Sequence, residues 1–157
     1  MEFSDNVNYV ILTSNNDKAF ISKLSMYQVL GMMEFEKLKD TLEMFPSKRV
    51  VFNESLSILS KEEKNIIFNL LAKQNISYIN VTSNIEDALY ADYIIVYEDD
   101  VKVLEGNKEM VLKNEKLLKK AGFGVPFVVD LSINLMYYDI LDKVYFDMES
   151  LLEALWN

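Results

Sequence analysis

The 157-residue chain contains no cysteine and no histidine. Without cysteine it can form neither a disulfide nor a thiolate metal site. Without histidine it has no Ser-His-Asp triad, no histidine-ligated metal and no histidine general base. Basic residues are also few, 16 against 25 acidic ones, and the net charge is -9. This acidic balance argues against a nucleic-acid partner, because phosphate backbones are bound by clustered basic side chains, and against adsorption to anionic lipid.

The sequence also lacks an apolar signal segment and a long apolar run. Residues 1–8 are acidic and polar, and no stretch approaches the roughly 18 apolar residues that indicate a membrane span. We therefore expect a cytoplasmic protein without direct membrane insertion, either free or peripheral at the inner face of the cell membrane. Half of the residues are hydrophobic, which is ample for a buried core in one domain with a small appendage.

Strand-like and helix-like segments alternate along residues 1–121. Short apolar runs predict strands at 9–12, 49–52, 77–81 and 92–97, and a turn at 98–100 predicts a hairpin strand at 101–105. Amphipathic or capped segments predict helices at 18–30, 34–45, 60–73, 84–89, 109–113 and 115–121. This alternation predicts an α/β fold, with a mostly parallel sheet flanked by helices. We expect Met26, Met32, Met33 and Met44 to fill gaps in the core, the alternative being a soft binding surface.

The pattern changes after residue 121. Residues 126–138 and the segment from Asp147 onward predict two further helices, separated by the apolar segment 144–146. We therefore divide the chain into a reduced α/β core, 1–121, and a small α+β C-terminal unit of the dimerisation type, 122–157. Apolar residues of this unit exceed the needs of so small a core, which is typical of an interface. The predicted interface residues are Phe127, Leu131, Leu135, Leu151, Leu155 and Trp156.

Four segments in the last two-thirds of the chain are specific in combination. They are residues 79–88, 91–106, 115–127 and 147–155. In this combination the chain resembles the ATP-binding subunits of energy-coupling-factor (cobalt-type) ABC transporters, mainly in their C-terminal half. The segments match, in order, the family's strand and switch segment, its late hairpin, and the start and final helix of its small C-terminal domain. The resemblance implies a reduced P-loop NTPase core of the ABC ATPase kind and a dimer.

The resemblance also implies a phosphate-binding loop after the first strand, and this loop departs from the family. Lys18 stands at the position of the phosphate-binding lysine, but residues 13–20 contain no glycine and no hydroxyl follows Lys18. A P-loop needs glycines so that backbone amides can converge on phosphate. Asp17 would moreover repel phosphate. The loop is therefore interpreted as an ordinary strand-to-helix turn with a solvated lysine.

At further positions of the family's nucleotide site, one residue type is retained and the others are altered. Asn53 stands where the magnesium-binding aspartate belongs, and a neutral amide holds Mg²⁺ less well than a carboxylate. Glu54 stands at the general-base position and is interpreted as vestigial or structural. Ser83 replaces the switch histidine and is interpreted as a helix N-cap. Residues 24–28 echo the signature sequence without its glycines and are interpreted as a helix interior.

Two functions are consistent with these departures. The first is a catalytically defective protein that needs no cofactor and acts by association, as a homodimer or as the partner of an intact transporter ATPase. The alternative is a weak ATP-binding or residual ATPase subunit of an uptake transporter for vitamins or metal ions, with ATP and Mg²⁺ at Lys18, Asn53, Glu54 and Ser83. A role unrelated to transport is a third reading.

A membrane coupling protein is a candidate partner, although residues 18–49 leave no room for the helical subdomain that normally contacts it. No metal site is predicted; the acidic hairpin tip at 98–100 is interpreted as solvated.

Overall fold

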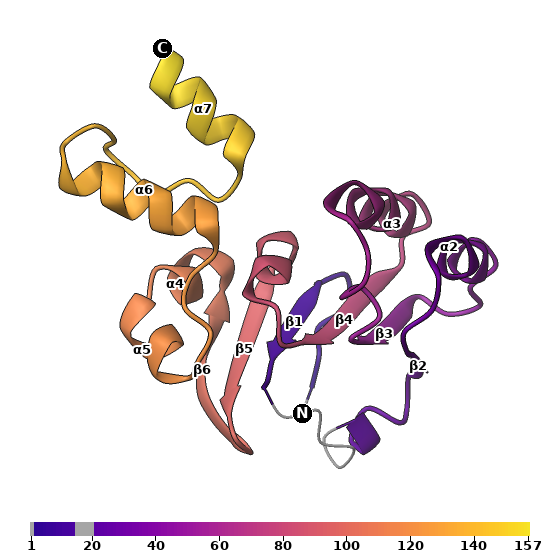
Figure 1. The fold of residues 1–157 in the computed structure, drawn as a ribbon. Helices are drawn as coiled ribbons and strands as arrows, with labels where there is room; N and C mark the ends of the chain where they lie inside the picture. Colours follow the sequence, from indigo (N-terminus) through magenta and orange to yellow (C-terminus); the bar gives the residue numbers. More distant parts are fainter. Residues whose placement is uncertain (1, 15–20) are drawn as a thin grey trace.

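The computed structural model describes residues 2–14 and 21–157, and its centre is a six-stranded sheet (Figure 1). The strand order is β2-β3-β4-β1-β5-β6; the first five strands in this order run parallel, and β6 runs antiparallel to β5. The bounds are β1 (Tyr9–Leu12), β2 (Gln28–Leu30), β3 (Arg49–Asn53), β4 (Ser77–Thr82), β5 (Tyr93–Glu98) and β6 (Val101–Asn107). The predicted mostly parallel sheet is confirmed.

Helices cover one face of this sheet. They are α2 (Phe35–Glu43), α3 (Lys61–Lys73), the 3-10 helix η1 (Ile85–Tyr90), α4 (Lys108–Leu112), α5 (Glu115–Lys120), α6 (Phe127–Tyr137) and α7 (Met148–Trp156). The predicted capping box opens α3: Ser60 Oγ accepts from the Glu63 amide at 3.1 Å, and the Glu63 carboxylate accepts from the Ser60 amide at 3.0 Å. Reciprocal capping of this kind satisfies two amides that the first helical turn leaves free.

The cross-strand register explains how the core is divided. Phe52, Asn80, Val10 and Ile94 stand side by side on four neighbouring strands and therefore share one face. That face packs against α2 and α3 on the β3 side, and against η1, α4, α5, α6 and α7 on the β1–β5 side. The intervening residues of the strands, among them Ile11, point to the opposite face, where Leu24 and Tyr27 lie.

The predicted helix at 18–30 is wrong after residue 22. Residues 15–20 lie outside the described part of the chain; after a short helical turn at 21–22, residues 28–30 form strand β2. The strand forms because Gln28, Val29 and Leu30 pair in parallel with the backbone edge of β3 that faces away from β4. Pairing with a neighbouring strand outweighs a local helical periodicity, especially in a short apolar segment. The interpretation of residues 24–28 as a helix interior is wrong too, because residues 24–27 form turns that lead into the strand at Gln28.

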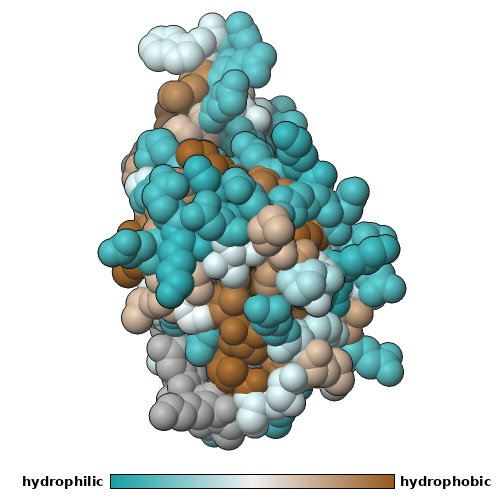
Figure 2. Space-filling view, turned by 90° about the vertical axis from the view of Figure 1, so that its right-hand side faces the viewer, coloured by the Kyte–Doolittle hydropathy of each residue, from teal (hydrophilic) through white to brown (hydrophobic). Residues whose placement is uncertain are grey.

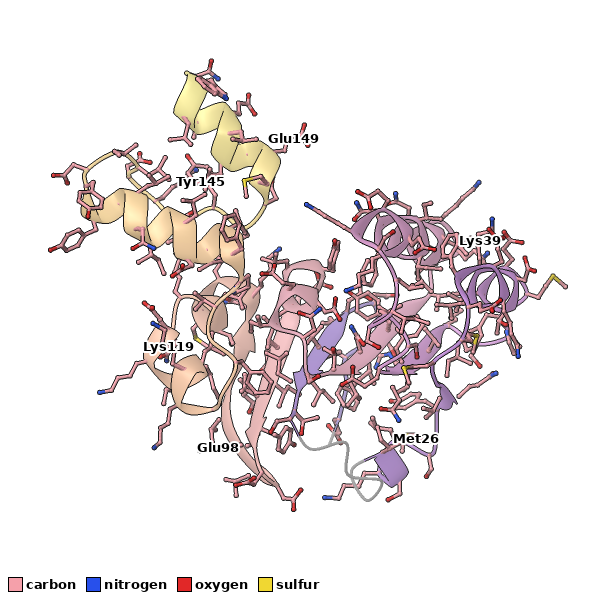
Figure 3. The ribbon with its side chains drawn as sticks, in the orientation of Figure 1. Met26, Lys39, Glu98, Lys119, Tyr145 and Glu149 are labelled. Carbon is pink, nitrogen blue, oxygen red and sulfur yellow. The ribbon has the colours of Figure 1, made fainter. Side chains whose placement is uncertain are left out.

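The methionine prediction is also mostly wrong. Met26, Met32 and Met44 are exposed, whereas Met33 packs against the core. Figure 2 looks at the side of the molecule that carries β2 and α2, and it shows an apolar band between hydrophilic groups. Met26, labelled in Figure 3, lies in the turn just before β2. The exposed methionines therefore flank the edge strand and its covering helix instead of filling the core.

The segment 122–157 is helical throughout its regular structure. It contains α6 and α7 and no strand, so its predicted α+β character is wrong. The apolar residues 144–146 do not pair with a strand, because the Tyr145 amide donates to Ser132 Oγ of α6 at 3.1 Å and the three side chains pack on the core. That core cluster joins Val10 of β1 to Val128 of α6 and Leu151 of α7.

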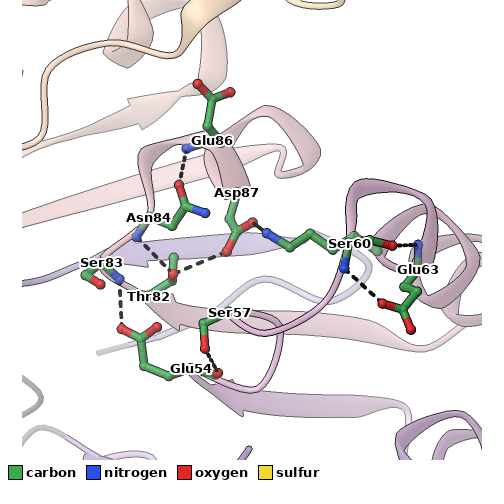
Figure 4. A network of polar contacts seen from close by, with 10 residues as sticks. Glu54, Ser57, Ser60, Glu63, Thr82, Ser83, Asn84, Glu86 and Asp87 are labelled. Carbon is green, nitrogen blue, oxygen red and sulfur yellow. Dashed lines mark hydrogen bonds and ion pairs between the residues drawn. The ribbon is translucent and has the colours of Figure 1, made fainter. Parts of the chain in front are cut away.

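A buried ion pair ties α3 to η1 (Figure 4). Lys64 Nζ lies 2.6 Å from Asp87 Oδ1, and the two side chains are only 10% and 1% exposed. The other carboxylate oxygen of Asp87 accepts from the Thr82 hydroxyl at 3.2 Å, and the Thr82 hydroxyl oxygen accepts from the Asn84 amide at 3.1 Å. The pair therefore fixes the chain just after β4.

Among the described residues, Asn80 is the one buried polar side chain whose nitrogen and oxygen have no hydrogen-bond partner. It lies at the centre of β4 and is fully buried, and neither its amide nitrogen nor its amide oxygen has a hydrogen-bond partner. Burying an unpaired amide opposes folding. This unpaired amide therefore lowers the free energy of unfolding at the middle of the sheet, on the strand between β3 and β1.

We expect Asp87→Asn to lower the free energy of unfolding by about 3 kcal/mol, because it leaves the Lys64 ammonium buried without a counter-charge. Urea denaturation followed by far-UV circular dichroism measures this loss. Glu115→Gln is the control: it removes the partner of Lys119 in a pair whose side chains are 34% and 62% exposed, and it should leave the midpoint close to that of the unsubstituted chain. Equal losses of unfolding free energy in Asp87→Asn and Glu115→Gln would contradict the conclusion that the Lys64–Asp87 pair is buried and costly to break.

We expect Asn80→Val to raise the free energy of unfolding by about 1–3 kcal/mol, because an apolar β-branched side chain replaces an unpaired buried amide. The same urea titration gives the result. Asn80→Asp provides the opposite comparison and should destabilise strongly, since it buries a charge. Loss of stability in Asn80→Val would mean that the amide has a partner, such as a buried water molecule.

Candidate functional site

Polar residues gather where β3, β4 and β1 end. These strands are neighbours and run parallel, so their carboxyl ends lie at one edge of the sheet. The ladder continues one residue beyond the strands: the Thr13 amide donates to the Thr82 carbonyl at 3.1 Å, and the Glu54 amide donates to the Val81 carbonyl at 3.0 Å. In open α/β sheets ligands bind outside the carboxyl ends of the strands, so this edge is the candidate site.

Glu54 is held in place by several contacts (Figure 4). Its carboxylate accepts a hydrogen bond from the Ser83 amide at 2.9 Å, which joins the end of β3 to the end of β4. Its carbonyl accepts from the Ser57 hydroxyl at 2.7 Å. The backbone of Glu54 has φ 55°, in the left-handed region, which costs a residue with a side chain about 1–2 kcal/mol. The surrounding contacts hold Glu54 in this conformation.

The structure brings three of the four predicted nucleotide-site residues together. Asn53 is the half-buried last residue of β3, Glu54 follows it, and Ser83 lies exposed after β4. Lys18 lies outside the described residues. The predicted N-cap role of Ser83 is wrong, because Asn84 caps η1 by accepting from the Glu86 amide at 3.0 Å. The Ser83 amide is instead the donor to Glu54.

The donor set of this edge is small. Among the described residues at these strand ends, 13–14, 53–55 and 83–84, Glu54 supplies the one carboxylate, and the others carry hydroxyls or neutral amides. Over residues 2–14 and 21–157, no group of three Asp, Glu, His or Cys side chains is arranged to hold a metal ion. Magnesium in nucleotide sites is held by one or two carboxylates together with substrate phosphates and water. Of this set only Glu54 is an anionic ligand, and its Oε1 already accepts from the Ser83 amide.

The predicted interface residues fall into three environments. Leu151 is fully buried among the core side chains, so it offers no surface to a partner, and this member of the prediction is corrected. Leu131 and Leu135 are half-buried. Phe127, at the start of α6, and Leu155 and Trp156, at the end of α7, are exposed, Trp156 to 83%. Only these three present a free side chain to a partner.

The sequence analysis missed other exposed apolar residues near the ends of α6 and α7. Together with Leu155 and Trp156 they make up what we call the distal apolar group: Tyr137, Tyr138, Ile140, Leu152, Leu155 and Trp156. The rings of Tyr137 and Tyr138 contact each other edge to face, with centroids 5.4 Å apart. Two adjacent tyrosines at the end of a predicted amphipathic helix are a signal that could have identified this group. In Figure 1 these helix ends lie far from α2 and β2.

No described helix combines the length and the apolar character that crossing a membrane requires. The candidate site and the distal apolar group are therefore the features of this chain to compare with known proteins.

No model of a known protein family matches the chain. It is 31% identical over 114 residues to the energy-coupling factor transporter ATP-binding protein EcfA1 of Lactobacillus delbrueckii subsp. bulgaricus, a match covering 69% of this chain and 40% of the relative. It is 35% identical over 89 residues to EcfA1 of Clostridioides difficile, covering 54% of this chain and 32% of that relative. The chain thus spans at most about two-fifths of the length of these relatives.

Solved structures share the fold at much lower identity. The structure of cbiO1 from Clostridium perfringens, part of the ABC transporter complex cbiONQ, has a TM-score of 0.53 at 13% identity and covers 88% of each chain. A bacterial Atm1-family ABC exporter with ATP bound has a TM-score of 0.57 at 9% identity, covering 75% of this chain and 36% of the exporter. The chain therefore has the fold of an ABC ATPase and belongs with the energy-coupling-factor transporter ATP-binding proteins, to which it is related over about two-thirds of its own length.

Proposed function

We propose that this protein is an ABC-ATPase-like chain that does not turn over ATP and acts by association with another protein chain. One observation carries the proposal: Glu54, the residue at the general-base position, binds the Ser83 amide and fastens β3 to β4. This bond engages Glu54 Oε1, and a general base that activates water for phosphoryl transfer also needs a cation beside it, whereas Asn53 supplies a neutral amide at the position of the cation-holding carboxylate. Glu54 acts here as a structural link between strands.

Charge and donor chemistry support the same conclusion. A triphosphate with its cation needs converging backbone amides, a lysine and a metal-holding carboxylate. Residues 13–20 contain no glycine, and Asn53 supplies a neutral amide at the carboxylate's position. The net charge of -9 adds repulsion toward a polyanion. No cofactor is therefore part of the proposed function, and no hydrolytic step is assigned.

The distal apolar group is the proposed contact surface. Trp156 and Tyr137 are each 83% exposed, and aromatic side chains are enriched at protein interfaces. Suitable partners are a second copy of the chain or an intact ABC ATPase. Because cbiO1 is part of a transporter complex, a membrane coupling protein is a further candidate, and the proposed location is the cytoplasm or the inner face of the cell membrane.

A second candidate function is weak ATP binding or residual ATPase activity in an uptake transporter for vitamins or metal ions. It is favoured by the convergence of Thr13, Glu54 and Ser83 at the sheet edge where ligands bind in this fold. On this alternative, Lys18 would contribute the charge that attracts phosphate.

Isothermal titration calorimetry with ATP and Mg²⁺ should detect no binding tighter than millimolar, because the edge cannot neutralise a triphosphate. A phosphate-release assay should give the same background rate for the unsubstituted chain and for Glu54→Gln, which keeps an oxygen to accept from the Ser83 amide. Tighter binding that disappears in Lys18→Ala, or turnover that disappears in Glu54→Gln, would establish the alternative function.

Light scattering after size exclusion should give the mass of a complex, either for the chain alone or after mixing with an intact energy-coupling-factor ATPase. Leu155→Asp combined with Trp156→Ser should abolish that complex, because the pair removes the apolar end of α7. Ile58→Ser is the matched control, since Ile58 is also an exposed apolar residue but lies in the loop after β3. The proposed surface is refuted if the chain is a monomer both alone and after mixing with the intact ATPase. It is also refuted if Ile58→Ser disrupts the complex as much as the double substitution in α7.

A further inference from the structure

Arg49 is a buried cation that has no counter-charge among the described residues. It is the first residue of β3, so it lies at the amino edge of the sheet, the end opposite the candidate site, and it is only 8% exposed. No salt bridge of the described part of the chain includes it. Removing an unpaired charge from water is costly, and a buried ionised side chain is therefore normally paired. Arg49 lacks such a partner.

Neutral groups hold the guanidinium of this arginine through Nε and Nη2. Nε donates to Ser77 Oγ, at the start of β4, at 3.0 Å, and Nη2 donates to the carbonyl oxygens of Ser4 and Val7 in the N-terminal segment. The guanidinium also lies over the rings of Tyr9 and Tyr27, 5.8 and 5.9 Å from their centroids. These contacts fix its position without supplying a negative charge. Nη1 donates no hydrogen bond to a described residue, so its N–H groups are available to a ligand.

Arg49 lines a cavity of about 220 Å³ between the N-terminal segment and the starts of β3 and β4. The other described residues of its lining are Asp5, Asn6, Tyr27, Lys48 and Ser77. The side-chain amide of Asn6 and the hydroxyl of Tyr27 add neutral donors to this lining. The cavity is smaller than the roughly 300–1,000 Å³ of pockets that hold drug-sized ligands. It therefore suits a small ion.

The charged side chains of this lining are two cations and one carboxylate, which leaves a formal charge of +1. Lys48 and Asp5 are both exposed, and neither forms a salt bridge with a described residue. Glu2 and Asp92, which line neighbouring hollows, do not belong to this lining. The net charge of -9 repels anions only at longer range, and salt screens that repulsion beyond about 8 Å. An anion in contact with Arg49 is therefore attracted.

We propose that this cavity binds a small oxyanion, a phosphate or a carboxylate group, between Arg49 and Lys48. The free N–H groups of Arg49 Nη1 donate to its oxygens, because the planar guanidinium matches both kinds of group in geometry. The bound oxyanion supplies the missing counter-charge. Since Arg49 also binds the carbonyls of Ser4 and Val7, the oxyanion strengthens the attachment of the N-terminal segment to the sheet. The proposal is independent of the proposed function, whose altered nucleotide positions lie at the carboxyl edge.

Two-dimensional amide NMR spectra of the whole chain, recorded during titration with inorganic phosphate or with acetate, test the proposal. Sodium chloride at the same ionic strength is the reference. The amide signals of Asn6, Lys48 and Ser77 should shift and saturate at low millimolar concentration with at least one oxyanion, and chloride should give no saturating shift. Tighter binding of phosphate assigns a phosphate ligand, and tighter binding of acetate assigns a carboxylate. The proposal is overturned if neither oxyanion gives a saturating shift.

Charge substitutions at the rim of the cavity give effects of opposite sign. Lys48→Gln should weaken oxyanion binding and Asp5→Asn should strengthen it, each by about twofold to fivefold, because each removes one exposed charge beside the ligand. Both residues are exposed, so the fold should persist. Arg49→Met should abolish the saturating shifts, with far-UV circular dichroism reporting whether this variant is folded.

Matched controls lie on α2, outside the cavity lining. Lys37→Gln and Asp40→Asn make the same charge changes at exposed positions. Both should leave the oxyanion dissociation constant nearly unchanged, because salt screens distant surface charges. Oxyanion binding that the two controls change as much as Lys48→Gln and Asp5→Asn do, or that Asp5→Asn weakens, would show that the anion does not lie in this cavity.

Discussion

The parallel pairing of β3 with β4 and of β4 with β1 is the constraint on which the rest of the structure depends. It brings three strand ends to one edge, where the Thr13 amide donates to the Thr82 carbonyl and the Glu54 carboxylate accepts from the Ser83 amide. It also sorts the strand side chains into two faces, because neighbouring residues in register point the same way. The helices α2 to α7 pack on one face. Leu24 and Tyr27 pack on the other.

The short helix η1, which follows β4, contacts both α3 and the C-terminal helix α6. Asp87 on η1 binds Lys64 of α3, and Glu86 beside it caps α6 through the Phe127 amide. Two adjacent residues of η1 therefore contact both α3 and α6. A buried ion pair is seldom a net source of stability, but breaking one is costly. The relative placement of α3 and α6 thus depends on a contact that tolerates little change.

The carboxyl edge of the sheet keeps the arrangement of an ABC ATPase fold while its chemistry differs. Strand ends converge there in the usual way, but Asn53 presents an amide and the Glu54 carboxylate is engaged with a backbone amide. Folds retain their packing more readily than their sites, because core packing depends on many side chains and a site on few. The proposed association through the distal apolar group uses a surface that does not depend on the donors of this edge.

The sequence by itself determined the parallel sheet, the capping box at Ser60 and the family resemblance, since these rest on local apolar runs and on residue types at fixed spacing. It also predicted Asn53 as an altered position and Glu54 as a retained position of the family's nucleotide site. Only the tertiary structure decided that residues 28–30 form a strand, because their partner β3 lies about twenty residues away in sequence and its pairing outweighs local periodicity. It likewise decided that Leu151 is buried while Trp156 is exposed. Both lie on one short helix, and which side of that helix meets the core depends on packing between segments far apart in the chain.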